Sequence, residues 1–63
     1  MAFRVDVEGG ESIERDKVVD AFEVAMGYAD KGLIDHVSIT DLSDGQRFPL
    51  RDFDQLMRKV LGL

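Results

Sequence analysis

The segment that most constrains the fold is residues 2–8, where apolar and charged side chains alternate strictly after Ala2. The apolar set is Phe3, Val5 and Val7, and the charged set is Arg4, Asp6 and Glu8. Successive side chains of a strand point to opposite faces of a sheet. The pattern therefore predicts a strand in a sheet that is buried on one face and open to solvent on the other.

A long helix is expected after this strand. Gly9-Gly10 ends the alternation, and Ser12 supplies a side-chain oxygen of the kind preferred at a helix N-terminus. We therefore predict a helix from about Ile13 to Lys31, with Gly32 in the left-handed conformation that often ends a helix.

A strand and a tight hairpin are expected next. Residues 36–42 alternate again, and Asp44-Gly45 is a pair favoured in two-residue hairpin turns. A turn of that length places Leu50 opposite Ile39 in the return strand. Pro49 has no amide hydrogen to donate, which favours an edge position for this strand.

The last element is an amphipathic helix. Asp52 and Gln55 have the spacing of a capping box at its start. Apolar residues then recur at helical spacing, at Phe53, Leu56, Met57, Val60 and Leu61.

The order β-α-β-β-α predicts an α+β fold in which residues 1–63 form a single small acidic domain. We expect a two-layer sandwich with a three-stranded mixed sheet and two helices on one face. A right-handed crossover through the long helix would make the first two strands parallel.

Composition narrows the function classes. Thirteen acidic residues against eight basic ones give a net charge of −5, which disfavours direct nucleic-acid binding. The apolar runs are too short to span a membrane, and the absence of cysteine removes disulfides and thiolate zinc sites. With no apolar leader at the N-terminus, a cytoplasmic protein without cofactor or metal is expected.

The sequence offers little for catalysis. His36 and Ser38 share one face of a predicted strand, but at about 7 Å they are too far apart for a direct pair. The loop from Asp41 lacks the spacing of a calcium loop, and Gly9-Gly10 lacks the lysine of a phosphate-binding loop. A non-enzymatic function is therefore expected.

An acidic stripe is predicted on the first helix. At about 100° per residue, Asp16, Asp20, Glu23 and Asp30 fall within roughly 80° of one another, with Gly27 among them. The stripe is either a solvated outer face or a docking face for a basic partner. Gly27 favours docking, because an exposed glycine in a helix often reflects close approach by another molecule.

The same helix has more apolar surface than one core requires. Its apolar arc covers roughly 220°, where about 100° suffices. One flank carries Val24 and Tyr28, and the other carries Val19 and Met26. The last helix can cover only one of them, so either flank is expected to form an exposed patch beside the acidic stripe.

Small size, acidity, the lack of catalytic residues and surplus apolar surface together resemble the gross character of small phage and mobile-element inhibitors, such as anti-CRISPR or anti-restriction proteins. The resemblance implies an inhibitor or regulator that docks on a basic protein surface, including one that otherwise holds nucleic acid. The alternative is a homodimer or larger homo-oligomer that buries the surplus helix surface against its own copy.

Overall fold

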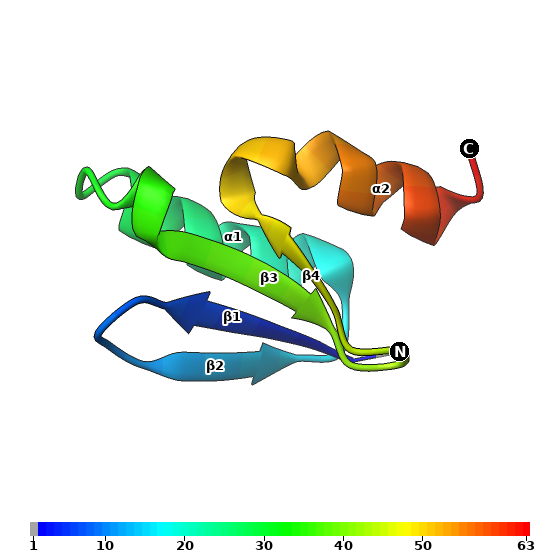
Figure 1. The fold of residues 1–63 in the computed structure, drawn as a ribbon, viewed down its shortest axis with the longest axis horizontal. Coiled ribbons are helices and arrows are strands. Elements are labelled where there is room, and N and C mark those ends of the chain that lie inside the picture. The colour runs from blue at the N-terminus through cyan, green and yellow to red at the C-terminus, as the bar shows by residue number, and fades with distance from the viewer. Residues whose placement is uncertain (1) are drawn as a thin grey trace.

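The computed structural model describes residues 2–63 as four strands, two α-helices and two short 3-10 helices (Figure 1). The elements in chain order are β1 (Phe3–Val7), β2 (Ser12–Arg15), α1 (Val18–Ala29), η1 (Ile34–His36), β3 (Val37–Asp41), β4 (Gln46–Pro49), η2 (Leu50–Asp52) and α2 (Phe53–Leu61).

The four strands form one sheet in the order β2-β1-β3-β4, and all neighbours are antiparallel. The predicted α+β class is confirmed, but the three-stranded mixed sheet is wrong. β1 and β3 pair antiparallel, not parallel, because an extra strand, β2, lies between β1 and the helix. The reversal at Gly9, with φ of 73°, turns the chain back before α1 begins.

The predicted helix start at Ile13 is wrong for the same reason. Ile13 lies opposite Val5 in the β1–β2 pairing, where it extends the apolar face of the sheet. The Ser12 hydroxyl donates to Asp6 on β1 at 2.7 Å and caps no helix. Cross-strand pairing thus outweighs the local preference of this segment for a helix, and α1 begins only at Val18.

The predicted helix stop is confirmed at Gly32, although the regular helix ends at Ala29 and not at Lys31. Gly32 has φ of 85°. Its amide donates to the carbonyl of Ala29, and the amide of Leu33 donates to the carbonyl of Tyr28. These two bonds form the terminating motif that satisfies the last carbonyls of a helix.

The β3–β4 hairpin has a four-residue turn, Leu42 to Gly45, in place of the predicted two-residue turn. Ile39 therefore lies opposite Phe48, not Leu50. The turn is set by Asp41, whose carboxylate accepts from the amide and hydroxyl of Ser43. The predicted edge position of Pro49 is confirmed, because β4 is an outer strand.

The predicted capping box before α2 is wrong. Asp52 precedes the helix but forms no side-chain capping hydrogen bond. The 3-10 turn η2 leads directly into Phe53, so the chain enters α2 through a tightened first turn.

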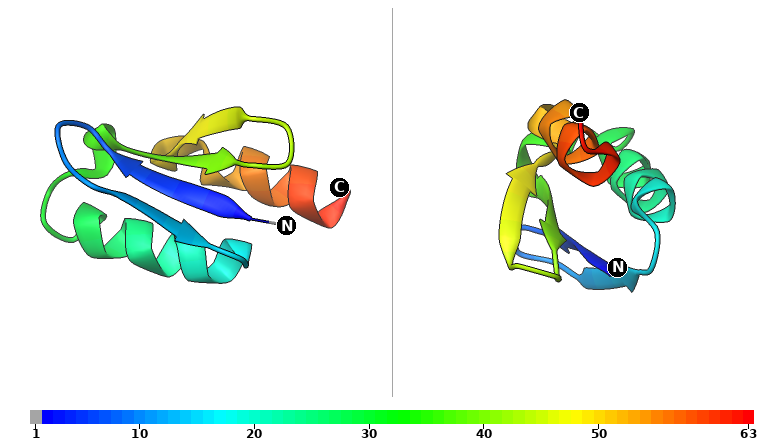
Figure 2. Two further views of the ribbon diagram at one scale, coloured as in Figure 1. Left: turned by 90° about the horizontal axis from the view of Figure 1, so that it is seen from below. Right: turned by 90° about the vertical axis from the view of Figure 1, so that its right-hand side faces the viewer.

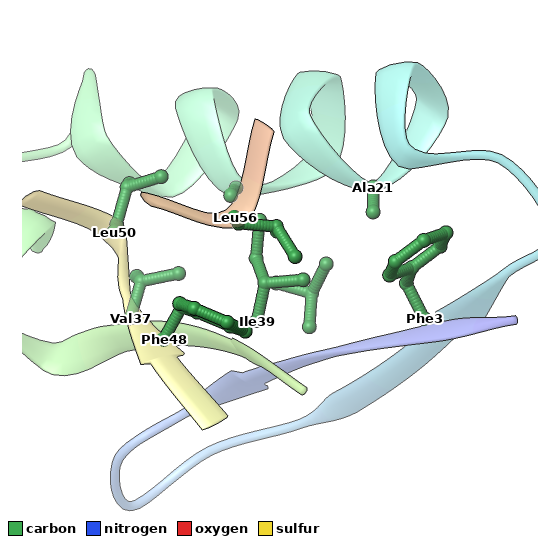
Figure 3. Close-up of a cluster of buried hydrophobic side chains, with 9 residues drawn as sticks. Phe3, Ala21, Val37, Ile39, Phe48, Leu50 and Leu56 are labelled. Atoms are coloured by element: carbon green, nitrogen blue, oxygen red, sulfur yellow. The ribbon is translucent and has the colours of Figure 1, made fainter. Parts of the chain in front are cut away.

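Both helices cover the same face of the sheet, as predicted (Figure 2). The buried apolar side chains meet between the two layers (Figure 3). They are Phe3, Val5, Ala21, Ala25, Val37, Ile39, Phe48, Leu50 and Leu56. The opposite face of the sheet carries polar side chains and is left uncovered by the helices (Figure 2).

Leu56 is the side chain of α2 that enters the core, and it is 0% exposed. We predict that Leu56→Ala lowers the free energy of unfolding by about 2–5 kcal/mol through lost burial and a residual cavity. Leu61→Ala, on the same helix but 60% exposed, should change it by less than about 0.5 kcal/mol. Urea unfolding followed by circular dichroism measures both. Equal losses would contradict the placement of α2.

Candidate functional site

The two flanks of α1 have different surroundings. Ala21 and Ala25 face the core, and Val24 and Tyr28 pack against it as half-buried side chains. The Tyr28 hydroxyl also donates to Glu11 in the β1–β2 turn, at 3.4 Å. The sheet and its first turn therefore cover this flank, and Val24 and Tyr28 form no exposed patch.

The opposite flank of α1 is the exposed one. Phe22 lies at its edge and stacks on Phe53 of α2, with ring centroids 4.0 Å apart. Beyond Phe22, Val19 is 57% exposed and Met26 is 36% exposed. α2 reaches α1 at this aromatic pair but leaves the two aliphatic side chains open. Of the two alternatives left by the sequence, the structure selects Val19 and Met26.

The predicted acidic stripe is shorter than expected. Asp16 lies before the first residue of α1. Because it is not helical, the angle that placed it with the other carboxylates does not apply, and it is not part of the stripe. Asp20 and Glu23 are exposed on the helix. Asp30 follows its last residue but keeps helical angles, with φ of −63° and ψ of −21°. The structure therefore brings three of the four predicted carboxylates onto one side of α1.

These residues define what we call the α1 outer surface: Val19, Asp20, Glu23, Met26 and Asp30. Four of its members, at positions 19, 23, 26 and 30, follow one ridge and alternate between apolar and acidic. Within residues 2–63, none of its three carboxylates takes part in an ion pair. The surface thus presents apolar groups and unneutralised negative charge together.

Gly27 lies on the same side of the helix, and a Cβ added there would meet no atom within 4 Å. Nothing in the fold requires a glycine at this position. We predict that Gly27→Ala raises the free energy of unfolding by about 0.5–1 kcal/mol, because alanine loses less backbone entropy in a helix. Thermal unfolding tests this, and a destabilised variant would contradict the exposed placement of this side of α1.

A separate group of charged residues lies at the β3–β4 hairpin and is structural. The Asp41 side chain is fully buried, and Lys59 of α2 donates to its carboxylate at 2.8 Å and to Asp44 at 2.6 Å. The hydrogen bond from Lys59, followed by those from Ser43, lowers the pKa of Asp41 to about 2. In the sequence, Asp41 is recognisable only as the start of a loop without calcium-loop spacing. Its partner, 18 residues away, is revealed only by the fold.

This group predicts how acid affects stability. The carboxyl of Asp41 has a pKa of about 2 in the folded chain against an ordinary 3.8, so the folded state binds fewer protons between these values. Its contribution is complete above about pH 4 and is lost as the pH falls toward 2. Asp41→Asn should lower the free energy of unfolding by about 1–3 kcal/mol at pH 7 and flatten its decline between pH 4 and 2. Urea unfolding at several pH values tests this; an unchanged slope would contradict it.

The open face of the sheet carries a hydrogen-bonded polar network. The carboxylate of Asp6 accepts from Arg4 at 2.9 Å, from Ser12 at 2.7 Å and from Thr40 at 3.2 Å. Burial alone would raise the pKa of Asp6, but the hydrogen bonds from Ser12 and Arg4 outweigh it and lower the pKa. Among the residues that the structure describes, no buried side-chain nitrogen or oxygen lacks a hydrogen-bond partner, so the network gives these polar residues a structural role.

His36 and Ser38 are not brought together. His36 belongs to the turn η1 and lies 3.6 Å from the carboxylate of Glu8, while the Ser38 hydroxyl accepts from Arg47 on β4. In the part of the chain that the structure describes, no three potential ligand side chains cluster as a metal site would require. Over the same residues, no helix is long and apolar enough to cross a membrane.

Two exposed apolar residues escaped the sequence analysis as surface features. Leu61 at the end of α2 is 60% exposed, and Leu63 is 86% exposed. Leu61 is one of the apolar residues that the sequence places at helical spacing along this helix. Its exposure could have been predicted from its direction around the helix, which is roughly 80° from Phe53 and farther still from the buried Leu56.

Comparisons of the chain with protein-family models, with curated proteins and with solved structures give no match.

Proposed function

We propose that this protein is a non-catalytic binding module that docks through the α1 outer surface on a basic surface of a larger protein and thereby inhibits or regulates it. The observation that carries the proposal is the ridge on which Val19 and Met26, both exposed, alternate with Glu23 and Asp30. An apolar centre bordered by charge is the usual anatomy of a protein interface.

The charges and the apolar groups have different roles in this proposal. Unneutralised carboxylates attract a basic partner over several ångströms and raise the association rate. The aliphatic side chains then lose contact with water and slow dissociation. A basic surface that otherwise holds nucleic acid fits this description, and docking there would block access to it.

Gly27 supports the close approach of a partner to α1. It costs the isolated helix stability, and its open surroundings give it no role in the fold. The open space at this position leaves room for a partner backbone or side chain to lie against the helix.

The proposal predicts that association depends on charge at α1 and on ionic strength. The full chain is used to isolate the partner, and association with the purified partner is then measured by surface plasmon resonance. Asp20→Asn/Glu23→Gln should slow association about tenfold at low salt, because electrostatic steering is lost. Raising the salt concentration should slow association of the unaltered protein in the same way.

The matched control is Glu8→Gln/Glu14→Gln, which removes the same charge from exposed residues outside α1. It should leave the association rate within about twofold. A similar loss in both variants would assign the effect to net charge, and a rate independent of salt would remove the carboxylates from the docking mechanism.

A homo-oligomer is the second candidate, favoured by the exposed side chains of Val19, Leu61 and Leu63. A second copy would bury them but would also bring a chain of charge −5 against its like. Sedimentation equilibrium at high micromolar concentration separates the two functions. A monomer supports docking on a different protein, and a tight dimer supports self-association.

A further inference from the structure

Two arginines lie on the face of the sheet that the helices leave open (Figure 2). Because Phe3 and Val5 are buried between the sheet and the helices, Arg4 between them points to the open face. Arg4 lies opposite Thr40 on β3, and Thr40 lies opposite Arg47 on β4. Thr40 is only 5% exposed although no helix covers it, which fits arginine side chains lying on either side of it.

Each arginine is held through one nitrogen of its guanidinium. The Nε of Arg4 donates to the carboxylate of Asp6 at 2.9 Å. The Nε of Arg47 donates to the hydroxyl of Ser38 at 2.8 Å. Within the described part of the chain, the terminal nitrogens of both guanidiniums form no hydrogen bond. Both side chains are thus restrained, while the donors that suit a carboxylate or a phosphate remain available.

The charge of Arg47 is not neutralised. Arg4 is paired with Asp6, but among the residues that the structure describes Arg47 takes part in no ion pair. Its anchor, Ser38, is a neutral residue. Glu14, which lies opposite Arg4, is on β2, at the other edge of the sheet from β4. The β4 side of the open face therefore carries a free positive charge in a chain whose net charge is −5.

The arginine pair lies on an open surface and not in a cavity, since the described residues enclose none. Small-molecule sites are usually concave. A small ion on an open surface keeps much of its water, so each exposed ion pair adds little to its binding. The open surface instead favours a segment of a protein that contacts both arginines at once.

The two anchors set the spacing of the acidic groups on such a segment. Asp6 and Ser38 lie directly opposite each other, so their Cβ atoms are about 5 Å apart. The Cα atoms of Arg4 and Arg47 are two strand spacings apart, or about 10 Å. Alternate side chains of an extended chain face the same way at about 7 Å, between these two values. Carboxylates at alternate positions of an extended segment therefore match the pair.

Nucleic acid is a poorer occupant of this face. Its strand carries a charge at every nucleotide and would extend over the carboxylates of Asp6 and Glu14 on β1 and β2. A protein segment needs only two carboxylates beside the arginines and can place neutral residues elsewhere.

We infer that the open sheet face is a second binding surface, on which the terminal guanidinium nitrogens of Arg4 and Arg47 donate to carboxylates at alternate positions of an extended acidic protein segment. The helices lie on the opposite face of the sheet, so a segment bound here leaves the α1 outer surface free. The inference goes beyond the proposed function and does not depend on it.

The probe is a synthetic peptide in which glutamates alternate with threonines. It is titrated into the full ¹⁵N-labelled chain and followed by NMR. The expected shift changes centre on Arg4, Thr40 and Arg47. The same peptide with glutamines in place of the glutamates should bind about fivefold more weakly or worse, because the charge-assisted hydrogen bonds are lost.

Arg47→Gln should weaken the glutamate peptide about fivefold or more. The matched control is Arg58→Gln, which removes the same charge from an exposed residue of α2 and should leave binding within about twofold. Arg47→Lys keeps the charge but not the forked donors, so it should give an intermediate loss. The spectrum of each free variant reports its folding.

Equal losses in Arg47→Gln and Arg58→Gln would assign binding to net charge and overturn the inference. Shift changes confined to the two helices, or none at millimolar peptide, would also overturn it. A thymidine oligonucleotide serves as a separate arm of the titration. Tighter binding of the oligonucleotide than of the glutamate peptide would show that the face prefers phosphates, against the inference.

Discussion

The buried ion pair between Asp41 and Lys59 is the interaction on which the arrangement of the second half of the chain depends. Asp41 is fully enclosed at the end of β3, and a carboxylate in such a place is tolerated only with a cation and hydrogen bonds around it. Ser43 closes the hairpin on the same carboxylate. One charged group thus connects the end of β3, the turn that follows it and the last helix.

That anchor also determines which surface remains free. Lys59 hydrogen-bonds to the hairpin, Leu56 is buried in the core, and Phe53 stacks on Phe22 of α1. A nine-residue helix held in this way does not extend over Val19. The exposed flank of α1 is therefore a consequence of where the sheet fixes α2, and the proposed docking surface follows from the packing.

Several features were predictable because their signals are local. The alternation in residues 2–8 and 36–42, the left-handed Gly32 and the edge position of Pro49 follow from side-chain period, glycine conformation and a missing amide hydrogen. The start of α1 was not predictable, because the sequence from Ser12 to Arg15 is compatible with either a first helical turn or a strand. The pairing of Ile13 with Val5 makes this segment a strand. Because the segment is a strand, the predicted parallel pairing of the sheet and the predicted place of Asp16 in the acidic stripe are both wrong.

By itself, the sequence determined the α+β class, the two helices on one sheet face and a first helix with acidic residues and more apolar surface than one core requires. Only the tertiary structure decided that the sheet has four antiparallel strands, that Asp41 is paired with Lys59 and that Val19 and Met26, not Val24 and Tyr28, face solvent. The reason is physical. Periodicity and capping act over a few residues, whereas register, buried charge pairs and the choice of exposed flank depend on contacts between segments far apart in the chain.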